Sequence, residues 1–128
     1  MWLYSREEPR MKTKTKIAVY NDGFIDCYKT NEMKSDFNAP KNAKKLSDMT
    51  FIVSLAFEEM SKRDQDLEFA EANNRQLSLK LKTPLYEGVN KMHKVVLNGS
   101  LYDIIKLDYS KKDEVMYFYL EEVRKIAE

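Results

Sequence analysis

The side chains that could carry out chemistry are few in this sequence and lie far apart. His93 is its only histidine and Cys27 its only cysteine, so neither a zinc site of Cys and His ligands nor a histidine-based triad is complete. His93 is predicted to lie at a strand edge or on the surface. Cys27 follows Ile25 by two residues in an apolar stretch, which indicates a small buried side chain rather than a reactive thiolate.

Two pairs of adjacent acids, Glu58-Glu59 and Glu121-Glu122, could in principle supply a general acid and a general base. Successive residues of a strand point to opposite faces, so neither pair is expected to converge on one substrate. The three glycines are too widely separated to form a glycine-rich phosphate loop. We therefore expect no enzyme activity, no cofactor and no metal ion.

The composition favours a single soluble domain rich in strands. Hydrophobic residues make up 43% of the chain and charged residues 34%, and 8 Tyr and 6 Phe accompany only 3 Gly and 3 Pro. Lys and Arg number 22 against 21 Asp and Glu, so the net charge of +1 gives no general attraction to a phosphate backbone or an anionic membrane. A lone cysteine favours a reducing compartment, and no apolar run is long enough to span a bilayer.

Strand patterns and turn signals recur along the chain. Two β-rich runs flank residues 21–23 and predict a hairpin, because Gly23 can adopt the positive φ of a tight turn. Asn98-Gly99 predicts a second hairpin, 110–114 a polar turn, and 115–123 a strand that is apolar on both faces. The tail 124–128 is expected to fray or to form a short C-terminal helical turn. Together these elements predict an all-β fold, a small antiparallel β-barrel or sandwich.

The middle of the chain allows two interpretations. Residues 49–57 alternate as a half-buried strand, and we expect a polar turn at 61–65 followed by a second extended segment. A helix is the alternative, because residues 58–75 are rich in helix-forming side chains. The next strand, 76–83, alternates strictly, so its leucines are expected in the core and Lys80 and Lys82 in water.

A long polar segment, 29–48, follows the first predicted hairpin and is expected to be a functional loop. Its candidate functional residues are Lys34, Phe37, Pro40, Lys41, Lys44 and Lys45. The basic and aromatic members also fit the pattern of single-strand binders, which leaves a small β-barrel module that binds single-stranded nucleic acid as an alternative function. Residues 1–13 are predicted to be an N-terminal arm, and 14–128 one β-barrel domain.

The stretch "GSLYDII", 99–105, resembles a signature of the head–tail joining proteins of tailed bacteriophages, also called head-closure or stopper proteins. The residues that carry the resemblance are Gly99, Tyr102, Asp103 and Ile104. The likeness runs in order from Ile17 to Val123 and includes Glu68 to Ala72 ahead of the leucine-rich strand. The sequence departs from the family where lysine replaces a frequent arginine in that strand.

The resemblance implies a β-barrel that assembles as a ring of about twelve copies below the portal and its adaptor. The ring closes the DNA-filled head and offers a surface for tail attachment. In the family a long loop points into the channel and helps to close it, and 29–48, with the candidate residues named above, occupies the matching position. Expected partners are neighbouring copies, the portal adaptor above, a tail terminator or tail-completion protein below, and packaged double-stranded DNA, with no membrane. The expected location is the neck of the virion, with the host cytoplasm before assembly. The nearest alternative is another connector or tail-completion protein of the same particle; its adaptors are mainly helical.

Two groups of residues are expected to have structural roles in such a ring: some stiffen the scaffold and others form contacts between subunits. Gly23 and Gly99 are expected to form stiff corners of the scaffold. The candidates for contacts between subunits are Trp2, Tyr4, Glu68, Tyr117 and Tyr119.

Overall fold

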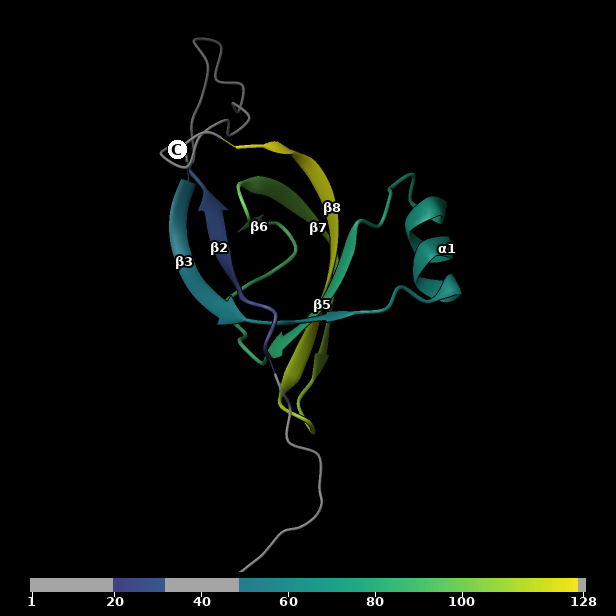
Figure 1. The fold of residues 1–128 in the computed structure, drawn as a ribbon, viewed down its shortest axis with the longest axis horizontal. Coiled ribbons are helices and arrows are strands. Elements are labelled where there is room, and N and C mark those ends of the chain that lie inside the picture. The colour runs from purple at the N-terminus through teal and green to yellow at the C-terminus, as the bar shows by residue number, and fades with distance from the viewer. Residues whose placement is uncertain (1–19, 32–48, 127–128) are drawn as a thin grey trace, which may run out of the picture.

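A single antiparallel sheet dominates residues 20–31 and 49–126, which are the part of the chain that the computed structural model describes. The described strands are β2 (Phe24–Thr30), β3 (Met49–Ala56), β4 (Glu58–Met60), β5 (Leu79–Pro84), β6 (Lys94–Leu97), β7 (Ser100–Ser110) and β8 (Val115–Lys125). They pair in the order β3-β2-β6-β7-β8-β5-β4. The described helix, α1 (Asp64–Ala72), lies outside the curled sheet, on the side of β5 and β8 (Figure 1). The expected all-β, antiparallel class is confirmed.

The curl of the sheet follows from the passage of the chain through Phe57. This residue alone separates β3 from β4, which are the two edges of the sheet order. Phe57 exchanges 3.0 Å backbone hydrogen bonds with Asp22 and Gly23, which extends the pairing of β2 with β3. One residue later, Glu58 pairs with Lys82 of β5. The chain thus joins both edges, although no β3–β4 ladder closes the sheet into a complete barrel.

The core lies inside the curl and is filled by alternate residues of the strands. Its fully buried side chains include Phe118, Ile25, Leu81, Met116, Leu120 and Val95. β8 lies between β7 and β5, and its alternate residues Tyr117 and Tyr119 point to the outer face, where α1 covers them in part. The prediction that residues 115–123 form a strand that is central or covered is confirmed, because β8 lies between two other strands.

The β6–β7 hairpin forms at the predicted place. Asn98 has φ 52° and Gly99 φ 77°, the two successive positive values that a two-residue hairpin turn requires. The predicted turn near 110–114 joins β7 to β8, with Glu114 at φ 58°. The predicted strand over 49–57 corresponds to β3.

The extended segment predicted after residue 65 is wrong, because residues 64–72 form α1. The Asp66 carboxylate accepts a 3.0 Å hydrogen bond from the Arg63 backbone N–H, and acids in the first turn favour the helix N-terminus. Asn74, at φ 58°, follows the last turn. These end signals make a short helix out of a segment whose hydrophobic pattern is weak.

Three further boundaries differ from expectation. β2 pairs with β3 over its whole length and with β6 over Asp26–Tyr28, so no edge of β2 is free there for the predicted hairpin partner. Residues 17–19 of that partner lie outside the described residues. Lys29 and Thr30 belong to β2 rather than to the long loop, of which 32–48 lie outside the description. β8 continues to Lys125, and the N–H of Ile126 donates to Gly99 O at 2.9 Å, so no helical turn forms up to residue 126.

Replacing Gly99 by alanine should destabilise the fold by about 1 kcal/mol, because an L-residue is strained at positive φ. The backbone conformation alone is responsible, since no atom lies within 4 Å of the position that a Cβ would occupy. The control Asn98→Gly should change the free energy of unfolding little. Urea denaturation of both variants measures this, and equal stabilities would contradict the role of Gly99 in the turn.

Candidate functional site

The residues considered for chemistry lie apart in the structure. Cys27 is fully buried in the core, and burial raises the pKa of its thiol to about 12. His93 is half-buried, and its Nδ1 accepts a 3.1 Å hydrogen bond from the Asn90 N–H. Burial, then the charge of Lys29, lowers the pKa of His93. Within the described ranges, no group of three or more His, Cys, Asp or Glu residues could hold a metal ion.

The most unusual polar feature is a buried ion pair between α1 and β5. Lys80 Nζ lies 3.0 Å from Asp66 Oδ2, and the two side chains are only 8% and 3% exposed. Lys80 was expected in water. Its strand does alternate as predicted, but α1 covers the outer face where Lys80 emerges. Sequence alternation identifies the outer face and does not say which part of it a helix will cover.

Asp66 holds this arrangement together through several donors. Burial works against its negative charge, but hydrogen bonds from the Arg63 side chain and backbone and from Lys80 outweigh burial and hold the pKa of the carboxyl well below its usual value. Arg63 Nη2 lies 3.0 Å from Asp66 Oδ1. The carboxylate therefore caps α1 and neutralises Lys80 at once.

Aromatic rings complete the contact between α1 and the sheet. Lys80 Nζ lies 5.3 Å from the ring centre of Tyr119, and Lys106 Nζ lies 4.9 Å from the same ring. Lys106 also lies 4.7 Å from the ring centre of Phe69 on α1. Such contacts favour cations over aromatic faces where water is scarce. Burial, followed by the charges of Asp108 and Asp66, raises the pKa of Tyr119 to about 12.

A pocket of about 330 Å³ opens beside this ion pair. It lies between the segment that follows β4 and the end of the β7–β8 hairpin, and Arg63, Lys80, Asp108 and Tyr117 are among its lining residues. Its lining cations are already engaged, because Asp66 binds both Lys80 and Arg63. The pocket is therefore a polar boundary of the α1 contact rather than an arrangement of nucleophile and base.

The residues that carry the resemblance stabilise the fold. Tyr102 and Ile104 pack in the core. Asp103 accepts a 2.7 Å hydrogen bond from Lys94 of β6 and one of 3.5 Å from Arg75, which also binds Glu121 of β8. Asp103 therefore ties β6 and β7 to the connection between α1 and β5. Gly23, at φ 125°, stands at the start of β2, where its O accepts from Phe57.

The interface candidates fall in different environments. Glu68 is exposed on α1, and Tyr117 is partly exposed beside the pocket. Tyr119 is buried within the chain, at 4% exposure, so it contributes to the packing of α1. Trp2 and Tyr4, and the loop candidates Lys34, Phe37, Pro40, Lys41, Lys44 and Lys45, lie outside the described residues.

The outer face of β2 and β3 carries exposed aromatic side chains that the sequence analysis did not single out. Phe24 is 66% exposed and Phe51 53%. The rings of Tyr28 and Phe51 meet edge to face, with their centres 5.7 Å apart. Strict alternation over 49–57 would place Phe51 on the same side as Leu55 and Phe57, but an irregularity in the β2–β3 register at Cys27/Tyr28 leaves Ile52 unpaired and turns Phe51 outward. Large exposed aromatic side chains such as these are typical of contact surfaces.

Neither a scan against models of known protein families nor a search of curated proteins finds a match to this chain. Among the described residues, no helix has the length and apolar character needed to cross a membrane.

Asp66→Asn should lower the free energy of unfolding by about 3 kcal/mol or more, because it leaves the Lys80 ammonium buried without a countercharge. Glu58→Gln is the matched control, because it breaks the more exposed Lys82–Glu58 pair, 3.3 Å apart, and should cost less than about 1 kcal/mol. Urea denaturation compares them, and equal losses would contradict the importance of the buried pair.

The same pair predicts how stability depends on pH. The folded pKa of Asp66 is lowered, so its contribution is fully present above the ordinary aspartate pKa of about 4 and is lost as the pH falls from there through the folded pKa. The free energy of unfolding of the native chain should therefore decrease more between pH 5 and pH 3 than that of Asp66→Asn. Parallel curves would show that Asp66 does not titrate in this way.

Cys27 should react with a disulfide reagent at pH 8 about 10³ times more slowly than an unfolded thiol, since the raised pKa alone reduces the thiolate fraction by that order. Stopped-flow absorbance with and without denaturant gives the ratio. Rapid labelling of the folded chain would place Cys27 outside the core.

Proposed function

We propose that this chain is a structural subunit of the head–tail connector of a tailed bacteriophage. In this function, copies form a ring below the portal and its adaptor, close the DNA-filled head and offer the surface to which the tail attaches. The observation that carries the proposal is that each residue behind the resemblance has a structural role at the β6–β7 turn and the start of β7. Gly99 makes the turn, Tyr102 and Ile104 enter the core, and Asp103 ties neighbouring elements together.

The character of that corner fits a protein whose work is to hold shape. A ring of identical copies closes only if each subunit keeps a fixed angle between its two contact surfaces. The longest strands, β7 and β8, pair along almost their whole length, and Asp103 connects this hairpin to Arg75 and Lys94. A stiff hairpin of this kind supports contact surfaces placed on other parts of the fold.

The outer face of β2 and β3 supplies one such surface. Phe24 and Phe51 are large, apolar and exposed, and Tyr28 packs against Phe51. The net charge of +1 allows many copies to approach without strong mutual repulsion. An adaptor of the same particle is a less suitable function, because such adaptors are mainly helical and the described part of this chain contains a single nine-residue helix.

If this surface joins copies, Phe24→Ser/Phe51→Ser should weaken self-association by about tenfold or more, as is usual when central aromatic contacts are lost. Sedimentation of the purified chain over a range of concentrations measures the effect. Met92→Ser is the matched control, because Met92 is 75% exposed but lies on the connection before β6. Equal effects of the two changes would exclude the β2–β3 face as the contact.

The wider proposal has its own test in the phage that encodes the chain. Particles that lack it should separate into filled or leaking heads and free tails in negative-stain images, and supply of the native chain should restore complete virions. Normal virions without the chain would contradict the proposal.

A further inference from the structure

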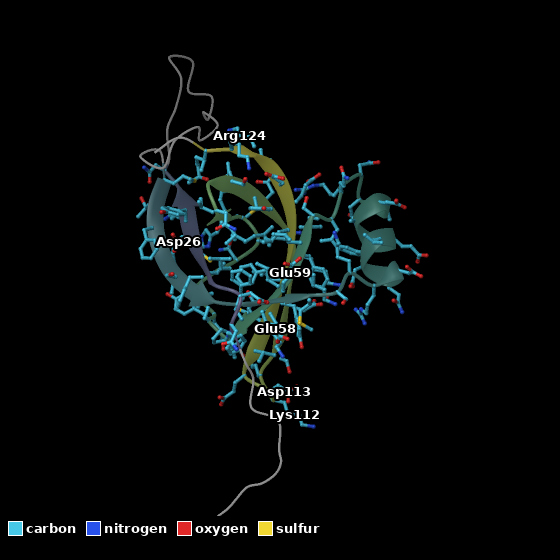
Figure 2. The ribbon with its side chains drawn as sticks, in the orientation of Figure 1. Asp26, Glu58, Glu59, Lys112, Asp113 and Arg124 are labelled. Atoms are coloured by element: carbon cyan, nitrogen blue, oxygen red, sulfur yellow. The ribbon has the colours of Figure 1, made fainter. Side chains whose placement is uncertain are left out.

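One end of the core opens into a pocket of about 380 Å³, which we call the mouth pocket. Its apolar part is formed by Phe57, Leu79, Leu81 and Leu97, and its acidic part by Asp22 and Glu59. Glu59 lies near the middle of the ring of strands in Figure 2, whereas Lys112 and Asp113 mark the distant tip of the β7–β8 hairpin. The pocket therefore combines an apolar floor with negative charge at its opening.

Glu59, which lines the mouth pocket, and Glu122, which lies on β8 outside its lining, project from the inner face of the sheet. Cross-strand partners share a face, and Glu59 pairs with Leu81 while Glu122 pairs with Tyr102, both core residues. The neighbouring acids on the outer face are neutralised: Glu58 binds Lys82, and Glu121 binds Arg75. Within the described ranges, Asp22, Glu59 and Glu122 form no ion pair with a cation. The Asp22 carboxylate accepts a 2.7 Å hydrogen bond from the Glu59 N–H, which brings these two acids together.

A second observation at the same place is the hydroxyl of Tyr102. This side chain lines the mouth pocket and is only 9% exposed, yet its hydroxyl makes no hydrogen bond within the described part of the chain. Burial, then the charges of Glu122 and Glu59, raises the pKa of Tyr102. The hydroxyl is therefore available at the pocket to accept a hydrogen bond from a ligand that supplies a donor.

These features define the chemistry of an occupant. An apolar floor suits the methylene stem of a lysine or arginine side chain, and carboxylates with a hydroxyl suit its charged end. The chain itself contains such side chains in its stretch "RMKTKTK", where Arg10, Lys12, Lys14 and Lys16 stand at every second position. If extended, a segment with this spacing presents all its cations on one side.

We propose that the mouth pocket binds a lysine or arginine side chain from the 10–16 segment of a neighbouring copy. This inference rests on the proposed assembly of copies. Asp22 borders the pocket, and a neighbouring copy can bring its segment there without any constraint from the chain that leads to Asp22. An arm of one copy in the pocket of the next is also a contact between unlike surfaces, as a ring requires.

Zero-length carbodiimide cross-linking of the full chain tests this contact, because it joins carboxylates to lysine amines that already touch. An equal mixture of ¹⁵N-labelled and unlabelled copies is cross-linked and the linked peptides are identified by mass spectrometry. Glu59 or Glu122 should link to Lys12, Lys14 or Lys16, and about half of these linked pairs should contain one labelled and one unlabelled peptide, as random pairing of copies requires.

In Glu59→Gln/Glu122→Gln the two substituted positions cannot react, so the measure is the yield of links from Asp22 to the 10–16 lysines, which should fall by about tenfold because two of the three attracting carboxylates are gone. Glu71→Gln/Glu87→Gln is the matched control, because it removes two exposed acids away from the pocket and should leave the yield unchanged. Circular dichroism of both variants verifies that the sheet is retained.

Two outcomes would overturn the inference. Absence of links between the pocket acids and the 10–16 lysines removes the segment as the occupant, and links only within uniformly labelled or unlabelled pairs show that each chain fills its own pocket. Neither outcome decides the proposed function. Sedimentation and the images of particles report on the ring and the connector independently of how the arm is placed.

Discussion

The geometry of this protein depends on one short passage of backbone, in which the chain leaves β3, crosses Phe57 and enters β4. Because these strands are the opposite edges of the sheet order, a single residue holds the two edges together. Phe57 is itself buried, at 4% exposure, and its backbone bonds to Asp22 and Gly23. The sheet must therefore curl, and the curl creates an inner face that holds the core and an outer face that needs its own cover. Both the α1 contact and the mouth pocket follow from this division.

The contact between α1 and the outer face of the sheet contains a buried ion pair, although an apolar contact could also cover this face. Desolvation of two charges consumes most of the attraction between Lys80 and Asp66, so the pair adds little net stability over a well-packed apolar substitute. The pair instead fixes the position of α1 on the sheet. Asp66 binds Arg63 at the start of α1 and Lys80 on β5, so a displaced helix would leave a buried ammonium without a partner. The apolar contacts of Ala70, Leu77 and Ile105 alone would tolerate such a shift more easily.

The parts of the fold that the sequence predicts are those fixed by local chemistry. Asn98-Gly99 determines a turn because both residues adopt positive φ, and the apolar run of β8 indicates a strand covered on both faces. The pairing of β2 with both β3 and β6 joins segments far apart in the chain, and no local signal specifies it. Lys80 was misplaced for a similar reason: α1 carries exposed Leu67 and Phe69, so its sequence does not show which face will meet the sheet. The sequence does not distinguish the two glutamates of each adjacent pair, because only the fold brings Lys82 to Glu58 and Arg75 to Glu121.

The difference between the paired and the unpaired glutamates distinguishes residues that stabilise the fold from residues that are available for outside contacts. Glu58 and Glu121 point outward, meet cations of the same fold and need nothing further. Glu59 and Glu122 project from the same face as core residues but are exposed, and no cation of the described residues pairs with them. Their carboxylates are therefore free to meet a cation from another segment or another copy. Carboxylates facing an unpartnered Tyr102 hydroxyl are therefore better understood as one half of an interaction whose cation comes from outside the described fold.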